Sequence, residues 1–252
     1  MIARMSTVGD AEEWLAGNIA GVIKIGDTVH RQVGAWTPAV HALLDHLAPR
    51  LPHIPRVLGF DEQGREVLDF MPGRVIDQSR ESLTEAQLLS IVGWTRDFHA
   101  AVARFTHPGP WRYFPVPEPT LIGHNDIAPY NSCFDGDDLI GVFDWDLSGP
   151  TTPLNELAFI AWNCVPLWAD IGADNAARRV ALIADAYGGF AARELLVAVP
   201  GRIRLMMDGI VASAAAGDPG MANLVAGGEP ESDRVSLAGL RDRIPGILSQ
   251  LP

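Results

Sequence analysis

Residues 124–131 read His-Asn-Asp-Ile-Ala-Pro-Tyr-Asn, and residues 142–146 read Val-Phe-Asp-Trp-Asp. In both segments polar side chains interrupt or end apolar, strand-like runs, and the fold is interpreted outward from them. The residues between them predict a β-hairpin, because a Gly-containing turn at 135–138 joins two short apolar runs. Such a hairpin would return Asp144 to the side of Asn131, thirteen positions earlier in the chain.

Phosphoryl transfer is the chemistry that needs side chains in this arrangement. The reaction depends on positioning and on neutralising charge. One carboxylate must lie near the acceptor hydroxyl to take its proton, while a second carboxylate and an amide oxygen hold Mg²⁺ against the nucleotide phosphates. A loop over 124–131 can direct Asp126 and Asn131 into one cleft, and the hairpin adds Asp144. The H-x-D-x-x-x-x-N pattern alone is a weak signal, and the spacing to Asp144 strengthens it.

These segments resemble the catalytic loop and the metal-binding Asp of protein-kinase-like folds, with Asn125 in the place of the protein-kinase Arg. The Phe-Asp-Trp at 143–145 is similar to the I-D-W form of the aminoglycoside-phosphotransferase family. Residues 149–158 resemble that family's G-D-P-x-x-D-L-A region, and residues 94–99 resemble its L-x-x-F-H helix. The resemblance covers roughly residues 15–215.

The resemblance implies an α+β, two-lobe, protein-kinase-like fold, with a small antiparallel sheet lobe and a mainly helical lobe. Residues 1–72 would form the strand-rich nucleotide-binding lobe. Residues 73–252 would form the helical catalytic and substrate lobe. The pattern of hairpin, helix and hairpin before the breaker at 71–73 agrees with this division.

The resemblance also implies roles for the polar residues. Asp126 is the expected general base, or the carboxylate that orients the acceptor hydroxyl. Asn131 and Asp144 are the expected Mg²⁺ ligands. His124 is expected to brace the loop rather than to react, which is close to the role of a satisfied core histidine.

The front lobe departs from the kinase pattern of a strand Lys paired with a helix Glu. Arg31 ends the strand before the predicted helix, and Lys24 lies on the preceding strand. The helix over 38–47 has Asp45 as its only acid. We favour Arg31 as the phosphate contact because of its position and because its planar guanidinium suits phosphate oxygens.

Two further segments of the front lobe are candidates for nucleotide contact. Phe70 and Met71 occupy the hinge position, where the resembling fold binds the purine through its backbone; a plain linker is the alternative. Gly17 and Gly21 bound at best a loose turn over the phosphates, since no G-x-G-x-x-G is present. The expected co-substrate is ATP or GTP.

Local signals also predict the helical elements. Ser82 and Glu85 have the spacing of a capping box at the start of a helix. A later helix over 195–216 is expected to be interrupted near Pro200. Residues 217–232 are expected to form a loop.

Composition limits the partners. The formal charge of −12 argues against nucleic acid, which selects basic surfaces, and either attracts a cationic substrate or only provides solubility. No apolar run suits a signal peptide or a membrane span, so no membrane partner is expected. Cys133 and Cys164 lie in apolar runs, which predicts buried thiols and a reducing, cytoplasmic location.

The acceptor remains open between several classes. Aminoglycosides are the family's name substrate, while related families phosphorylate choline, homoserine, macrolides and sugar amines. Asp146, Glu156 and Asp170 could bind ammonium groups near the cleft, although Glu156 could equally stabilise a helix N-terminus. A nucleotide-binding pseudokinase is the non-enzyme alternative, motivated by the missing Lys–Glu pattern.

Overall fold

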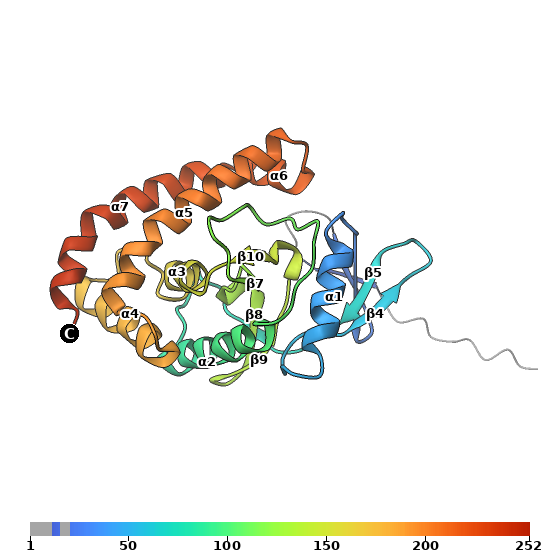
Figure 1. Ribbon diagram of the computed structural model, residues 1–252, viewed down its shortest axis with the longest axis horizontal. Coiled ribbons are helices and arrows are strands. Elements are labelled where there is room, and N and C mark those ends of the chain that lie inside the picture. The colour runs from blue at the N-terminus through green and yellow to red at the C-terminus, as the bar shows by residue number, and fades with distance from the viewer. Residues whose placement is uncertain (1–11, 16–20) are drawn as a thin grey trace, which may run out of the picture.

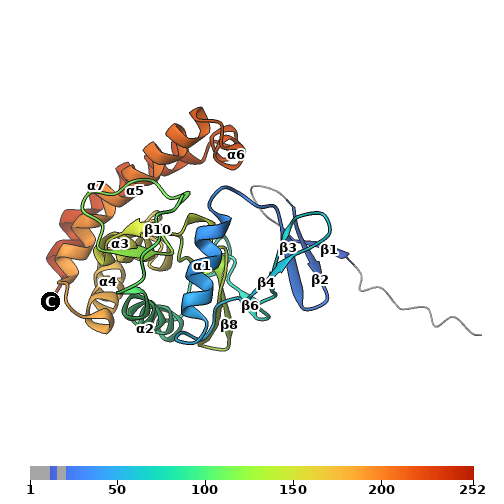
Figure 2. The ribbon, with the colours of Figure 1, turned by 45° about the vertical axis from the view of Figure 1, so that its right-hand side comes forward.

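The computed structural model describes residues 12–15 and 21–252. A sheet of short strands lies at one end of the molecule, and helices make up most of the other (Figures 1 and 2). This arrangement confirms the predicted α+β, kinase-like fold with a strand-rich front part and a helical remainder.

The front sheet is antiparallel and has five strands in the order β1-β2-β3-β5-β4. They are β1 Glu12–Leu15, β2 Val22–Ile25, β3 Thr28–Arg31, β4 Val57–Phe60 and β5 Glu66–Asp69. A turn at Gly26-Asp27 joins β2 to β3 in the first predicted hairpin, and Gly26 adopts the left-handed φ of 57° that such a turn favours. Helix α1, Thr37–Leu47, lies between this sheet and the helical part (Figure 2).

The helical part carries two small sheets on which the polar segments lie. One sheet has the order β6-β8-β9 and the other pairs β10 with β7. Their strands are β6 Arg74–Val75, β7 Leu121–Gly123, β8 Ser132–Asp135, β9 Asp138–Val142 and β10 Gly149–Thr151. The hairpin of β8 and β9 confirms the pairing predicted between Asn131 and Asp144.

Among the described residues, six helices surround these two small sheets, which together form a platform for the polar segments. They are α2 Glu85–Val102, α3 Pro153–Cys164, α4 Ala173–Tyr187, α5 Ala192–Ala215, α6 Pro219–Gly227 and α7 Glu229–Gln250. The fully buried side chains of α2, α3 and α5 meet in one hydrophobic core with those of α1. This core holds the platform rigidly, as a precise site requires.

The capping box of α2 lies two residues later than predicted. Thr84, not Ser82, accepts the backbone N–H of Gln87 at 3.0 Å, and the Gln87 side chain accepts the N–H of Thr84 at 3.0 Å. The sequence Ser-Leu-Thr-Glu-Ala-Gln offers two pairs at the same spacing. The hydroxyl of Thr84 also donates to Asp137 on the β8–β9 turn at 2.7 Å, a tertiary contact that local spacing does not reveal.

The prediction of an interruption at Pro200 was wrong. Helix α5 runs unbroken through Pro200. Its buried stripe continues on both sides of the proline and includes Leu195, Leu196, Val199, Ile203 and Met207. Burying this stripe offsets the roughly 3 kcal/mol that an internal proline costs.

The loop expected at 217–232 was also wrong, because α6 and the start of α7 occupy it. Asp218 caps α6 by accepting the N–H groups of Gly220 at 2.9 Å and Met221 at 3.1 Å. Pro219 follows at the first helical position, and Gly228 ends the helix with a φ of 80°. These are ordinary start and stop signals, so this helix could have been predicted.

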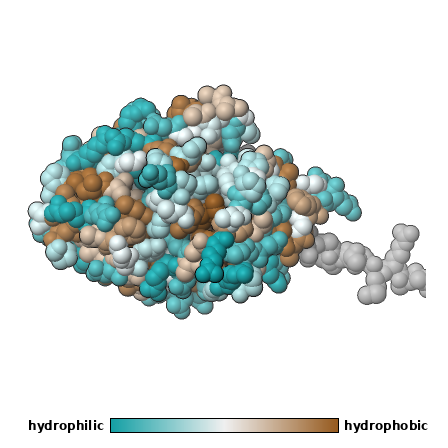
Figure 3. All heavy atoms as spheres, in the orientation of Figure 1, coloured by the Kyte–Doolittle hydropathy of each residue, from teal (hydrophilic) through white to brown (hydrophobic). Residues whose placement is uncertain are grey.

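Hydrophilic and hydrophobic residues are interspersed on the face shown in Figure 3. Within the described part of the chain, no helix is long and apolar enough to cross a membrane. Both cysteines are buried free thiols, as predicted.

Candidate functional site

Asp126 and Asn131 lie together at the turn that leads from β7 into the 3₁₀ segment Pro129–Asn131. The Asn131 side-chain nitrogen donates to the Asp126 carboxylate at 2.8 Å and to the Asp126 carbonyl at 3.0 Å. Tyr130 donates its hydroxyl to the other carboxylate oxygen at 2.9 Å. Since the amide nitrogen is used in this way, the side-chain acceptor of Asn131 is its Oδ1, which accepts no hydrogen bond from the described residues.

Burial and a neighbouring acid control the ionisation of Asp126. Burial raises its pKa, the charge of Asp144 raises it further, and Tyr130 and Arg202 partly offset both, which leaves a pKa of about 7. A carboxylate with this pKa is a better proton acceptor near neutral pH than an ordinary Asp.

His124 is fully buried and supports the loop that carries Asp126. Its Nε2 lies 3.1 Å from the carbonyl of Phe143, and its Nδ1 lies 3.3 Å from the N–H of Asp126. These partners define a neutral tautomer with the proton on Nε2. Burial lowers the pKa of His124, which also favours the neutral ring. The geometry supports the predicted bracing and leaves no free nitrogen for the reaction.

Asn125 adopts a left-handed conformation with a φ of 65°, which Asn tolerates better than most residues. Its backbone N–H donates to Glu156 at 2.6 Å. Its side-chain amide donates to the carbonyls of Leu147 at 3.2 Å and Gly149 at 3.1 Å. The residue before Asp126 is therefore tied to α3 and to the segment that follows Asp144.

Glu156 was a candidate for binding a cationic substrate, and the structure shows that it is inaccessible. Its carboxylate is fully buried, and His99 on α2 lies 2.5 Å from the oxygen that Asn125 does not use. Burial would raise the pKa of Glu156, but these hydrogen bonds more than offset burial and lower it. Tyr187 extends the group, 2.8 Å from the other nitrogen of His99.

Asp144 lies two residues beyond the end of β9 and has a φ of 61°, and its side chain is 48% exposed. The N–H of Phe143 donates to the carbonyl of Asn131 at 3.0 Å, so the backbone places Asp144 next to Asn131. Two side chains with oxygen ligands for a metal ion are thus carried by adjacent backbone segments. Mg²⁺ is held in this way in nucleotide sites, by one or two carboxylates with phosphates and water completing its shell.

The described residues contain no cluster of three or more His, Cys, Asp or Glu side chains that could hold a metal ion. An all-protein metal cage is therefore absent from the part of the chain described. The pair of Asn131 and Asp144 fits a metal ion that shares its coordination with a nucleotide.

Arg31 reaches Asp144 from the front sheet. Its Nη1 donates to Asp144 at 3.1 Å, its Nε lies 3.0 Å from Glu66, and its Nη2 contacts Asp146. Glu66 comes from β5, where it is the direct cross-strand partner of Arg31, and His41 on α1 lies 2.9 Å from it. The Arg31–Glu66 ion pair thus joins two strands, whereas the Lys–Glu pair of the kinase pattern joins a strand to a helix.

A second arginine continues this chain of charges. Arg112 lies 3.5 Å from the second oxygen of Asp146 and 2.7 Å from Asp218, the capping residue of α6. Its guanidinium lies 4.3 Å from the ring centroid of Trp36, just before α1. Nothing in the sequence pattern singled out Arg112, because its partners are far away in the chain.

At the hinge only one of the two predicted residues has a free backbone donor. The N–H of Phe70 donates to the carbonyl of Asp27 at 2.9 Å. The N–H of Met71 has no partner among the described residues, and Pro72 has no N–H. Lys24 lies over the ring of Phe70, 4.6 Å from its centroid, and pairs with Glu13 at 3.6 Å. Gly17, which was predicted with Gly21 to bound a turn over the phosphates, lies outside the described residues.

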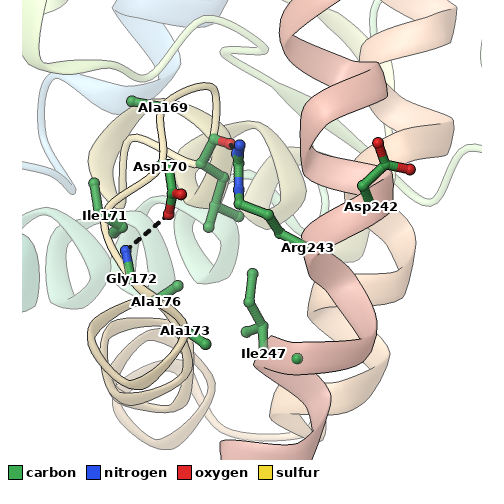
Figure 4. Close-up of a pocket in the computed structure, with 11 residues that line it drawn as sticks. Ala169, Asp170, Ile171, Gly172, Ala173, Ala176, Asp242, Arg243 and Ile247 are labelled. Atoms are coloured by element: carbon green, nitrogen blue, oxygen red, sulfur yellow. Dashed lines mark hydrogen bonds between the residues drawn. The ribbon is translucent and has the colours of Figure 1, made fainter.

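Asp170 does not join this group. It lines a separate cavity of about 360 Å³ between the start of α4 and α7, where Arg243 donates to the carbonyl of Leu167 (Figure 4). None of the residues around Asp126 lines that cavity. Trp145 and Trp162 are buried core residues, 1% and 3% exposed.

Comparisons with known proteins agree with this geometry. Residues 111–196 match a family described as the phosphotransferase enzyme family (APH). The trifolitoxin immunity protein of Rhizobium leguminosarum bv. trifolii is 31% identical over 192 residues, which cover 68% of this chain and 72% of that protein.

Solved structures share the fold at low sequence identity. An amicoumacin kinase, solved with AMP-PNP, Ca²⁺ and its antibiotic, gives a TM-score of 0.62 at 13% identity, over 92% of this chain and 87% of that one. A microcompartment-associated aminopropanol kinase gives 0.60 at 12% identity, over 96% and 94%. Aminoglycoside 2'-phosphotransferase-IIIa, solved with GDP, gives 0.57 at 13% identity, over 93% and 94%.

Proposed function

The chain belongs to the phosphotransferase enzyme family, and on this premise we propose that it transfers the γ-phosphoryl group of a nucleoside triphosphate to a hydroxyl group of a small molecule. The observation that carries the proposal is the group at the end of the β8–β9 hairpin. There a half-buried carboxylate with a raised pKa, Asp126, lies 2.8 Å from Asn131 and interacts electrostatically with Asp144.

Each of these side chains has a defined task. Asp126 accepts the proton of the acceptor hydroxyl, or orients that hydroxyl, as the transfer proceeds. Asn131 Oδ1 and the Asp144 carboxylate would hold Mg²⁺, and the bound ion would supply neutralisation of the charge on the transferring phosphoryl group. His124 and Asn125 keep the loop in place.

The front sheet supplies the nucleotide contacts. Arg31 would contact phosphate oxygens of the bound nucleotide, while Glu66 retains its guanidinium and the Asp144 carboxylate would be available to hold the metal ion. The free N–H of Met71 donates to the purine, and Phe70 contributes its ring rather than its N–H. ATP and GTP are both compatible with this arrangement.

An antibiotic or toxin is the acceptor class that the relatives favour. The relative with 31% identity is named an immunity protein, and proteins of the same fold are named for aminoglycosides and amicoumacin. A metabolite kinase is the second candidate, supported by the fold shared with the aminopropanol kinase. The pseudokinase alternative loses its main argument, because Arg31 and Glu66 provide the ion pair that appeared to be missing.

The test is transfer of labelled γ-phosphate from ATP and GTP, with Mg²⁺, to separate panels of aminoglycosides, other antibiotics and hydroxylated amines. We expect one panel to give a product heavier by one phosphoryl group. Nucleotide binding without transfer to any panel would support the pseudokinase alternative instead.

A further inference from the structure

Arg202, on α5, is a buried cation without an acidic partner. Its side chain is 3% exposed, and no carboxylate among the described residues lies within ion-pair distance of it. Its Nη2 donates to the carbonyl of Asn125 at 2.8 Å, while its Nε and Nη1 have no hydrogen-bond partner. No sequence motif contains this residue.

Keeping an unpaired guanidinium out of water is unfavourable, so other interactions must stabilise it. Two aromatic rings face it, with centroids 4.4 Å away for Phe159 and 5.3 Å away for Tyr113. Such cation–π contacts are strongest when the cation is desolvated. Arg202 also interacts electrostatically with the carboxylate of Asp126, although the two groups form no ion pair.

The carbonyl that Arg202 binds belongs to the peptide that enters Asp126. Glu156 holds the N–H of the same residue at 2.6 Å. The left-handed Asn125 is thus held by an anion on its amide side and by a cation on its carbonyl side. Rotation about this residue would redirect the Asp126 side chain.

We infer that Arg202 is a positioning residue for Asp126, which fixes the peptide between Asn125 and Asp126 through its hydrogen bond to the Asn125 carbonyl. This inference rests on the proposed function for the role of Asp126. In the resembling kinases a loop Arg occupies the position of Asn125, and here α5 supplies a cation to the same loop from a distant part of the chain.

The test compares Arg202→Met and Arg202→Lys with a matched control, Arg179→Met. Arg179 is also buried, at 6% exposure, donates one hydrogen bond to a carbonyl, that of Cys164 at 3.0 Å, and has an unpartnered Nε. It lies on α4 and touches no part of the catalytic loop. Loss of a buried arginine is therefore common to both Met variants, and only the location differs.

Hydrogen exchange and phosphoryl-transfer kinetics are measured on each folded variant. Hydrogen exchange of the amides of Asn125 and Asp126 should speed up about tenfold in Arg202→Met, because the loop loses a hydrogen bond to a charged group, and should be unchanged in Arg179→Met. The kcat for phosphoryl transfer should fall about 100-fold in Arg202→Met at an unchanged KM for nucleotide. Arg202→Lys should recover most of the loss, since a Lys ammonium can still donate to the carbonyl.

Equal exchange in both Met variants would overturn the inference, as would losses of kcat that match in Arg202→Met and Arg179→Met. A wild-type chain that transfers no phosphate to any acceptor would contradict the proposed function. The exchange measurement does not depend on turnover, so the two failures are distinguishable.

Discussion

At the scale of single residues, the orientation of Asp126 depends on buried groups around the loop that carries it. Asn125, His124 and Glu156 are all fully buried, and each holds a backbone atom of the loop or is held by one. Hydrogen bonds within buried polar networks restrict motion, because breaking one leaves a desolvated group without a partner. The precision of the site therefore comes from its supporting shell.

Glu156→Gln tests this support through stability. The pKa of Glu156 is lowered in the folded protein, below its ordinary value of 4.5. Its ionised form therefore stabilises the fold above about pH 4.5, and that contribution is lost as the pH falls through the lowered pKa. At neutral pH, Glu156→Gln should reduce the free energy of unfolding by about 1–3 kcal/mol, with a weaker dependence on acid than wild type.

Urea unfolding at several pH values measures this effect. Glu194→Gln, an exposed acid in the first turn of α5, is the control and should behave like wild type. A Glu156→Gln variant as stable as wild type at neutral pH would show that the carboxylate is not a structural anion.

Sequence reasoning found Asp126, Asn131 and Asp144 because they share a local motif and one hairpin. It missed Arg112 and Arg202, whose decisive contacts lie at separations of 106 and 77 residues. It predicted Arg31 but not its acid Glu66, because that pair depends on the register between β3 and β5. Local spacing contains no information on such partners.

At the scale of elements, the boundaries of helices and strands can be predicted wherever the sequence offers only one suitable turn or cap residue. The hairpin of β2 and β3 could be predicted, because few residues other than Gly fit its tight turn. Where two choices exist, as at the start of α2, a tertiary contact decides. The unbroken α5 shows the same effect, because a buried apolar stripe overrides its proline.

Thr84→Ala tests the cap of α2. Removing the hydroxyl should lower the free energy of unfolding by about 1 kcal/mol, because the N–H of Gln87 loses its acceptor. Thr84→Ser keeps the oxygen and should stay close to wild type. Ser82→Ala serves as the comparison in urea unfolding, since Ser82 is exposed and is not the cap. A larger effect at Ser82 than at Thr84 would reverse the assignment.

At the scale of the whole molecule, ion pairs join the front sheet to the helical part. Arg31 connects Glu66 on the sheet with Asp144 and Asp146 beyond β9, and Arg112 extends the connection to Asp218 on α6. In the proposed function, Mg²⁺ and nucleotide bind near the middle of this series of ion pairs, at Asp144. The two parts of the molecule should therefore be stabilised together when the site is filled.

Thermal unfolding with and without Mg²⁺ and nucleotide checks this coupling. At a free ligand concentration about 100 times the Kd, wild type should gain about 2.7 kcal/mol of stability. Asp144→Ala should lose the Mg²⁺-dependent part of this gain, because it removes the charged metal ligand. The control is Asp138→Ala, an exposed acid on the β8–β9 hairpin, which should keep the full gain. An unchanged gain in Asp144→Ala would refute its role as a ligand.

The most direct measurement is phosphoryl transfer by Asp126→Asn, with Mg²⁺-nucleotide affinity measured on the same sample and Asp138→Asn as the control. The account predicts that transfer falls by about 10²- to 10⁴-fold, because the amide cannot accept the proton of the acceptor hydroxyl. Affinity for Mg²⁺-nucleotide should remain close to wild type, since Asn131 and Asp144 are intact. Undiminished transfer by Asp126→Asn would contradict the assignment of the base, and with it the central claim about how this site works.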